Sequence, residues 1–236
     1  MAAPHSTRQE HAPPASEQPD VEVTLAGTGE REEDTPAVEE LDAETRARRD
    51  EALARVRKFG DPVLRASALP VDRFDDALAT EVAQMGELMH DALGIGLAAT
   101  QLGVLHRVLV YRAYADDPLT ALVNPMLEWT SDEMETAEEG CLSLPGVHVD
   151  VERPAQVRVR AQDEAGKVLQ IEAEGLEARV IQHEIDHLDG VLILDRIPRQ
   201  ARKEAMRAMR EAQEPNAEAA RGAKAAAGAH GDDVAA

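Results

Sequence analysis

The chain has 236 residues and a formal net charge of −21, and five of its residues are aromatic. This length predicts one domain or two small ones, and the strong negative charge argues against a general nucleic-acid binder, DNA included. No stretch reaches the roughly eighteen apolar residues that a membrane-spanning helix needs, and residues 1–19 lack the apolar core of a secretory signal. The one cysteine cannot form an internal disulfide, so we expect a reducing compartment, namely the cytoplasm.

The two ends of the chain differ from its middle in composition. Residues 1–45 are rich in Pro, Glu, Asp, Thr and Ala without a sustained apolar period, and residues 213–236 are mainly Ala, Gly and charged residues. Such segments bury too little apolar surface to offset the entropy lost on ordering. We therefore expect a disordered acidic N-terminal extension over 1–45, one folded domain over 46–212 and a disordered tail over 213–236.

The first half of the expected domain contains one clear helix and two short strands. In residues 74–93 apolar side chains recur every three or four positions, which predicts an amphipathic helix that ends at Gly94. Residues 106–111 and 119–123 are short runs rich in β-formers, which predict strands.

In the second half of the expected domain, segments with the hydrophobic period of a strand alternate with a segment that has the period of a helix. Residues 157–171 alternate apolar and polar side chains around a polar turn, which predicts a hairpin. Residues 174–188 predict a helix that ends shortly before Gly190, and residues 191–194 predict a strand. Hairpins beside isolated helices favour an α+β fold, in which antiparallel sheets and hairpins pack around the central helix 174–188.

That helix carries the strongest chemical signal, because residues 183–187 read His-Glu-Ile-Asp-His. Residues four apart share one helix face, so His183 and His187 can bind one metal ion. Glu184 is not a ligand in this geometry but lies beside the metal. A carboxylate there can take a proton from metal-activated water and later deliver it to a leaving group.

A third metal ligand is needed, and its identity separates enzyme classes. Extended zinc-protease signatures place a histidine where this chain has Ile193, which cannot ligate. Another protease class uses a glutamate where Glu204 falls, but Glu204 lies among arginines that are its more natural partners. Cys141 is the better candidate, although a lone cysteine is often only a small buried apolar residue.

The segment around Cys141 favours the ligand interpretation. Residues 138–146 read Glu-Glu-Gly-Cys-Leu-Ser-Leu-Pro-Gly. Gly140 permits a close approach of the backbone, and Pro145 and Gly146 mark a bend soon after. Such a segment can approach a metal while it leaves the Leu142 N–H free for a substrate oxygen.

A third motif, residues 94–101, reads Gly-Ile-Gly-Leu-Ala-Ala-Thr-Gln. Its glycines match part of a dinucleotide-binding fingerprint, but it follows a predicted helix and precedes a predicted strand, which is the wrong context. One interpretation is a tight loop against which an extended peptide can lie, with Gln101 offering an amide donor. The alternative is a plain glycine-rich helix stop.

Together the three motifs resemble those of the peptide deformylases, which remove the formyl group from the initiator methionine of bacterial and organellar proteins. The resemblance covers roughly residues 58–196 and rests on residues 94–101, 139–143 and 182–187 in family order, with Gly-Asp-Pro-Val-Leu-Arg at 60–65. It implies a metal-dependent hydrolase that acts on N-formyl-methionyl nascent peptides and releases formate.

The resemblance also implies the ligands and catalytic groups. The metal would be held by Cys141, His183 and His187, with water in the fourth position. The family commonly uses Fe²⁺, with Ni²⁺ or Co²⁺ as substitutes and Zn²⁺ in some members.

By the same resemblance, Glu184 would be the general base and then the general acid. Gln101 and the Leu142 N–H would stabilise the oxyanion of the tetrahedral intermediate.

The expected substrate pocket begins on the same helix face as the histidines. Leu176 and Val180 lie two turns and one turn before His183, so a methionine side chain can rest on them while its formyl group reaches the metal. Ile95 can close this pocket, and Gly96 and Gly140 permit a close approach of the peptide backbone. The alternative is that Leu176 and Val180 are simply core residues.

A last helix is predicted over residues 199–212, and basic side chains line one face of this part of the chain. They recur at steps of three and four: Arg196, Arg199, Lys203, Arg207 and Arg210. Some deformylases dock on the ribosome through a C-terminal helix, so ribosomal RNA is one candidate partner. The alternative is a solvated helix face paired with Glu204 and Glu211.

Two other functions remain open at this stage. A metallopeptidase would cleave ordinary peptide bonds, and the absence of a histidine at Ile193 counts against it. A metal-stapled binding module without catalysis would need neither Glu184 nor Gln101.

Overall fold

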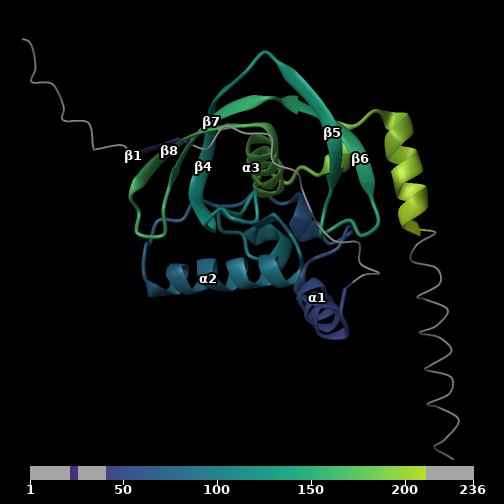
Figure 1. The fold of residues 1–236 in the computed structure, drawn as a ribbon, viewed down its shortest axis with the longest axis horizontal. Helices are drawn as coiled ribbons and strands as arrows, with labels where there is room; N and C mark the ends of the chain where they lie inside the picture. The colour runs from purple at the N-terminus through teal and green to yellow at the C-terminus, as the bar shows by residue number, and fades with distance from the viewer. Residues whose placement is uncertain (1–21, 26–40, 211–236) are drawn as a thin grey trace, which may run out of the picture.

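The computed structural model describes residues 22–25 and 41–210 (Figure 1). Two parts of the segment expected to be disordered have regular structure in it: the strand β1 (Glu22–Leu25) and the first residues of the helix α1 (Ala43–Arg55). The rest of the expected extension, and the expected tail over 213–236, lie outside the described residues. No helix among the described residues has the length and apolar character that crossing a bilayer requires.

The larger sheet contains six strands in the order β1-β8-β7-β4-β3-β2. Its further strands are β2 (Gly96–Ala98), β3 (Val108–Tyr111), β4 (Thr120–Thr130), β7 (Gln156–Gln162) and β8 (Val168–Glu174). β1 pairs with β8 in parallel, and the other neighbouring pairs are antiparallel. The two predicted strands and the predicted hairpin are confirmed as β3, the start of β4, and β7–β8.

A second, two-stranded antiparallel sheet consists of β5 (Met134–Gly140) and β6 (His148–Pro154). It lies on the side of the molecule where the C-terminal helix packs (Figure 1). We did not predict this pair because three of the seven residues of β5 are Glu and the strand lacks the apolar alternation of a half-buried strand. The two antiparallel sheets with separate helices confirm the α+β class.

The helix α2 (Asp76–Asp91) confirms the first predicted helix and lies against the larger sheet (Figure 1). The Asp75 carboxylate caps its start by accepting from the N–H groups of Ala77 and Leu78. Its buried face shares a core cluster with β2 and β3. The helix ends at Asp91, three residues before the predicted end at Gly94, and Leu93 in between has a left-handed φ of 57°.

The helix α3 (Gly175–Leu188) confirms the second predicted helix and is buried along most of its length. Gly190 follows it with φ of 73°, and a Cβ there would lie 2.7 Å from the Arg65 carbonyl oxygen, so only glycine fits. α3 contacts β2, β3, β6 and β8, and thus both sheets. Several of its buried residues are charged, which requires partners from other elements.

The prediction of a strand over residues 191–194 is wrong. Residues Ile193–Arg196 form the short helix α4, and the Asp195 carboxylate accepts from the Leu192 N–H at 2.9 Å and so caps the turn. Four apolar residues in a row are too few to separate a strand from a helical turn. Residues 199–210 are helical, and the predicted end at 212 lies outside the described residues.

Candidate metal centre and active site

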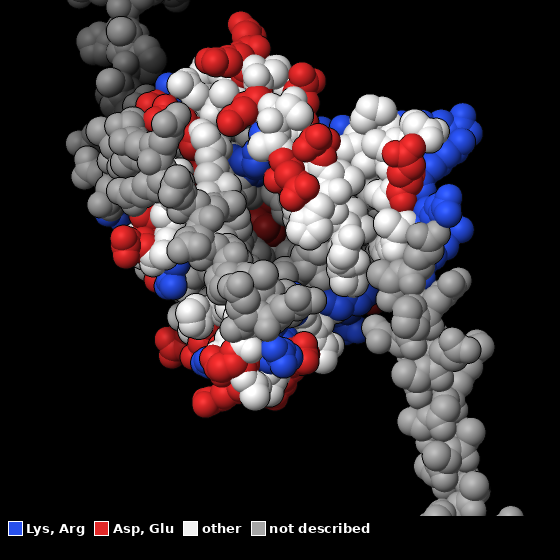
Figure 2. Space-filling view, turned by 45° about the vertical axis from the view of Figure 1, so that its right-hand side comes forward, with Lys and Arg blue, Asp and Glu red and all other residues white. Residues whose placement is uncertain are grey.

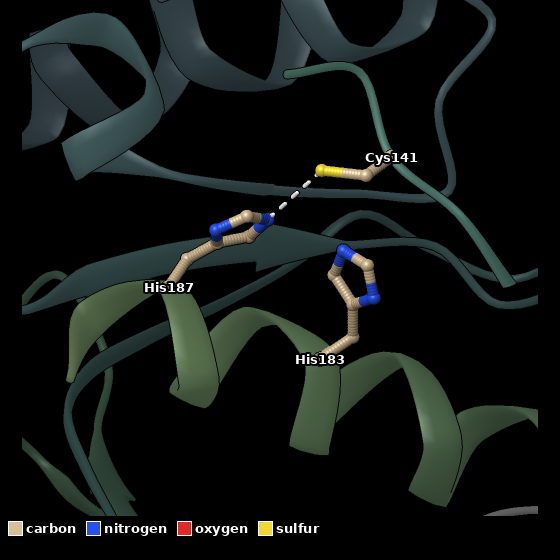
Figure 3. Close-up of side chains that lie close together, drawn as sticks. All are labelled: Cys141, His183 and His187. Atoms are coloured by element: carbon tan, nitrogen blue, oxygen red, sulfur yellow. Dashed lines mark hydrogen bonds between the residues drawn. The ribbon is translucent and has the colours of Figure 1, made fainter. Parts of the chain in front are cut away.

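Three side chains from distant parts of the chain converge next to α3 (Figure 3). Cys141 directly follows β5, and His183 and His187 project from successive turns of α3. One ligand atom from each lies within 4.8 Å of the others, and the Cys141 Sγ is 3.2 Å from the His187 Nε2. The structure therefore brings together the cysteine and the two histidines that the sequence singled out.

The surroundings of these side chains fit a metal ion. The His183 Nδ1 is 2.9 Å from a Glu139 carboxylate oxygen, which leaves its Nε2 for a ligand and fixes the ring as outer partners of metal-bound histidines do. The buried Nδ1 of His187 has no hydrogen-bond partner among the described residues. A thiolate with two imidazoles is a donor set that suits divalent transition metals.

Electrostatics around the two imidazoles differ. Burial lowers the pKa of His183, but its interactions with Cys141 and Glu139 outweigh burial and raise the pKa well above the ordinary value. Burial, followed by the charge of His183, holds the pKa of His187 well below that value. The Glu139 carboxylate beside His183 thus favours positive charge at this position, which a bound cation would supply.

A buried network of charges supports this centre. Arg153 donates to Glu139 at 2.6 Å and to Asp186 at 2.9 Å, and Arg179 donates to Glu139 at 2.8 Å. Arg196 pairs with Asp186 from the other side. Burial raises the pKa of Glu139, but the hydrogen bonds from His183 and Arg153 lower it to about 2. We did not predict this network from the sequence. The signal that could have indicated it is the presence of charged residues among the apolar residues of α3.

Glu184 lies on α3 beside the same centre. Its Oε2 is buried without a hydrogen-bond partner among the described residues, and burial is the main cause that raises its pKa to about 7. The backbone of Gly96 fits closely against it, since a Cβ on Gly96 would lie 2.4 Å from the Glu184 Oε1. The glycine therefore lets β2 approach the carboxylate.

The expected oxyanion donors, Gln101 and the Leu142 N–H, lie close to Cys141. The Gln101 Oε1 accepts from the Ala98 N–H, and its Nε2 lies 3.2 Å from the Ser143 Oγ and 3.8 Å from the Cys141 Sγ. Gln101 belongs to the 3-10 helix η3 (Ala99–Leu102), so the predicted tight loop is a short strand followed by this turn. Among the described residues, the Leu142 N–H makes no hydrogen bond, while its carbonyl accepts from Lys58.

A pocket of about 470 Å³ connects these groups. Figure 2 shows a hollow on this face of the molecule with an acidic side chain deep inside it. All the residues expected at the site line the pocket except the fully buried His187: Ile95, Gly96, Gln101, Gly140, Cys141, Leu142, Leu176, Val180, His183 and Glu184. Leu176 and Val180 also pack on a core cluster, so the pocket and core interpretations hold together. Arg49 and Leu53 of α1 line it as well and were not expected.

The two positions at which the protease classes would place their third ligand, Ile193 and Glu204, lie outside the metal cluster. Ile193 is buried in a separate apolar cluster with Leu64 and Leu144. Glu204 accepts from Gln200 at 2.6 Å on the exposed face of the C-terminal helix. Among the described residues, neither joins the cysteine and histidines, and this counts against both protease classes.

Comparison with known proteins points to one family. The sequence model described as Polypeptide deformylase matches residues 53–203. Peptide deformylase of Thermotoga neapolitana is 49% identical over 145 residues, which cover 61% of this chain and 87% of that protein. Peptide deformylase of Parafrankia sp. is 45% identical over 152 residues, which cover 64% of this chain and 82% of that protein.

Solved structures agree with the sequence relatives. A crystal structure of a peptide deformylase from Synechococcus elongatus in complex with actinonin matches with a TM-score of 0.62 and 44% identity, covering 64% of this chain and 84% of that one. The peptide deformylase structure from Thermotoga maritima matches with a TM-score of 0.59 and 45% identity, covering 61% and 97%. Since the family match spans more than half of the sequence, the chain belongs to the polypeptide deformylase family.

Proposed function

We propose how this chain performs the reaction of its family, the hydrolysis of the N-formyl group from formyl-methionyl nascent peptides with release of formate. One observation carries the proposal. The Cys141 sulfur and two imidazoles converge beside Glu184, whose Oε2 is buried and lacks a hydrogen-bond partner among the described residues. In this proposal α3 is the central helix of the fold, because it carries three of these four side chains and contacts both sheets.

Cys141, His183 and His187 are the proposed ligands of one divalent metal ion. When bound, the ion would act as a Lewis acid toward the formyl carbonyl and the attacking water. Several divalent metals suit this donor set. We propose Fe²⁺ on the family resemblance, with Ni²⁺, Co²⁺ and Zn²⁺ as alternatives. Metal analysis of anaerobically purified protein tests this choice, and zinc in place of iron would contradict it.

Glu184 is the proposed general base and then the general acid. Its free Oε2 is placed to accept a proton from the attacking water and later to give it to the amide nitrogen of the departing peptide. The close packing of Gly96 against the other carboxylate oxygen supports this role, because it restricts where the side chain can lie.

Gln101 Nε2 and the Leu142 N–H are the proposed donors to the oxyanion of the tetrahedral intermediate. Both flank Cys141, and the Leu142 N–H has no competing acceptor among the described residues. Removing one such donor typically raises a barrier by about 3 kcal/mol. Ser143 competes for the Gln101 amide at 3.2 Å, so substrate would have to share or displace this hydrogen bond.

The proposed methionine pocket is the apolar end of the cavity. Leu176 and Val180 supply its floor from α3, and Ile95 closes it from the glycine-rich segment. Gly96 and Gly140 line the same cavity, where the absence of side chains permits backbone contact with the peptide. We further propose that the enzyme works in the cytoplasm, where nascent formyl-methionyl chains are made.

The proposal predicts a separation of metal binding from catalysis. Glu184→Ala should keep its metal yet release formate from a formyl-Met peptide at least about a hundredfold more slowly, because general acid–base catalysis is lost. Glu184→Gln should show the same loss of activity, and because Gln is nearly the size of Glu it should leave no cavity. The matched control is Glu152→Ala, which removes an exposed glutamate of β6. Near wild-type turnover in either Glu184 variant would remove the assigned mechanism.

The rival functions are outcomes of the same assay. Cleavage of an unformylated Met peptide by the wild type would favour a metallopeptidase. Metal binding without release of formate would favour a non-catalytic module.

We also propose that the C-terminal helix docks on the ribosome. Basic side chains gather on the side of the molecule where this helix lies (Figure 2), and Arg199, Lys203 and Arg210 are exposed. Arg196 is also exposed, but its charge is already paired with the buried Asp186. Glu204 accepts a hydrogen bond from Gln200, and Glu211, the other glutamate of the alternative interpretation, lies outside the described residues.

Charge reversal tests the docking proposal without removing the helix, whose Ala205 and Met209 are buried. Replacing Arg199, Lys203 and Arg210 by Glu should abolish co-sedimentation with ribosomes, while deformylation of a short peptide persists. The control variant reverses three exposed arginines elsewhere: Arg55, Arg73 and Arg160. Co-sedimentation that survives reversal of the helix charges would end the docking proposal.

A further inference from the structure

The helix α1 forms part of the wall of the active-site pocket. Arg49 and Leu53 lie four residues apart, so they share one helix face, and both line the pocket. The family match begins at residue 53, so Arg49 lies before the matched residues. This side chain is therefore a feature of this chain that the family match does not cover.

α1 is held in place by its own apolar face. Ala52 and Val56 are buried, and Leu53 packs against the same core cluster as Leu142. The Arg48 guanidinium lies 4.0 Å from the Asp91 carboxylate at the end of α2. The pocket-facing side of the helix is thus fixed relative to the pocket by packing on the other side.

The segment after α1 hydrogen-bonds to the backbone carbonyls of the two residues that carry the proposed oxyanion donors. The Arg57 N–H donates to the Gln101 carbonyl at 2.7 Å, and the Lys58 Nζ donates to the Leu142 carbonyl at 2.9 Å. Burial is the main cause that lowers the pKa of Lys58, and the charge of Arg49 lowers it further while Cys141 acts in the opposite direction. Arg49 is therefore close enough to act electrostatically on the catalytic end of the pocket.

Arg49 differs from the charged residues that line the pocket apart from the proposed catalytic Glu184. Arg179 is committed to Glu139, and Glu138 lies 3.4 Å from the His148 imidazole on the neighbouring strand. Arg49 is half-buried and has no hydrogen bond or ion pair with another described residue. A partly desolvated guanidinium without a partner is suited to bind a carboxylate.

We propose that Arg49 is a specificity-determining residue that favours formyl-methionyl peptides with an acidic side chain directly after the methionine. The formyl group must reach Glu184 and the metal ligands, and the methionine occupies the Leu176–Val180 end, so the following residues extend along the remaining lining of the pocket. Arg49 and Leu53 belong to that remaining lining. The inference rests on the proposed function, because it concerns the peptide that the site deformylates.

The test compares three C-terminally amidated peptides that carry Glu, Gln or Lys directly after formyl-Met. For the wild type, kcat/KM should be higher for the Glu peptide than for the Lys peptide by about fivefold, the effect of an ion pair of ordinary strength. The difference should reside mainly in KM and should shrink as salt is added. Arg49→Gln should bring the ratio of kcat/KM for the Glu peptide to that for the Lys peptide close to one. Arg49→Glu should invert this ratio, and Arg49→Lys should retain it.

The matched control is Arg55→Glu, which makes the same change in net charge on the exposed part of the same helix, outside the pocket lining. It should keep the wild-type preference. Two results would overturn this inference while leaving the proposed function intact. One is equal kcat/KM for the Glu and Lys peptides in the wild type. The other is the same Glu-to-Lys ratio of kcat/KM in Arg49→Glu and in Arg55→Glu. Failure of the wild type to release formate even from the Gln peptides would overturn the proposed function and this inference with it.

Discussion

The wall of the pocket that carries His183 and Glu184 is held by buried ion pairs, whereas the wall formed by residues 94–101 is held by backbone hydrogen bonds and small side chains. In the first wall, Arg153 lies between Glu139 and Asp186. In the second, the Gly94 N–H donates to the Met89 carbonyl and the Arg112 N–H to the Ile95 carbonyl. Charges that must hold a metal ligand need directional partners, while a surface that receives a peptide needs exposed backbone.

Among the substitutions that test this contrast, we expect the largest effect from a replacement of Arg153. Replacing it by Met leaves two buried carboxylates short of a partner, so the free energy of unfolding should fall by about 3–5 kcal/mol. The control Arg158→Met removes an exposed pair with Glu172 and should cost less than about 1 kcal/mol. Urea unfolding of both variants measures the difference, and equal costs would contradict the assigned role of the buried network.

An intermediate effect is expected at Gly96 in the second wall. In Gly96→Ala the new Cβ would lie 2.4 Å from the Glu184 Oε1, so the carboxylate must move. A displacement of this kind can lower kcat/KM by about a hundredfold. Metal content should stay at the wild-type level, since no proposed ligand is touched. Unchanged formate release would show that the close fit of β2 to the carboxylate has no catalytic role.

The smallest effect is expected where the sheet meets the start of α3. The Tyr111 hydroxyl donates to the Glu177 carboxylate at 2.8 Å, so Tyr111→Phe should lower the free energy of unfolding by about 1 kcal/mol. Burial raises the pKa of Glu177 and the Tyr111 hydrogen bond lowers it, so this bond favours the ionised carboxylate.

The cost of Tyr111→Phe should therefore be larger at pH values above the pKa of Glu177 than below it. Unfolding measured at a mildly acidic and a mildly alkaline pH checks the sign. A background of Glu177→Gln should remove the pH dependence. A cost that is the same at both pH values would contradict the assigned hydrogen bond.

The chemistry of the centre could be predicted because few residue types can perform it. Two histidines four apart on a helix share a face by geometry alone, and one cysteine in the whole chain leaves a single candidate thiolate. That Cys141 approaches His187 within 3.2 Å depends on the fold, and here the family resemblance supplied what spacing could not.

The partners of the buried charges could not be predicted, because they come from distant segments. Arg153, Glu139 and Asp186 belong to β6, β5 and α3, and each sequence neighbourhood alone is compatible with an exposed charge. α1 was missed for another reason, since it is short of large apolar residues. Its signals were the N-cap Asp42 and a run of good helix formers.

The central claim is that the Cys141 thiolate completes the metal centre with His183 and His187. Its most direct test is the metal content of anaerobically purified wild type and Cys141→Ala, with His106→Ala as a control because His106 is an exposed imidazole outside the cluster. We predict about one tightly bound metal ion per chain in the wild type and in the control, as such sites hold. We predict little or none in Cys141→Ala, and full occupancy in that variant would contradict the claim.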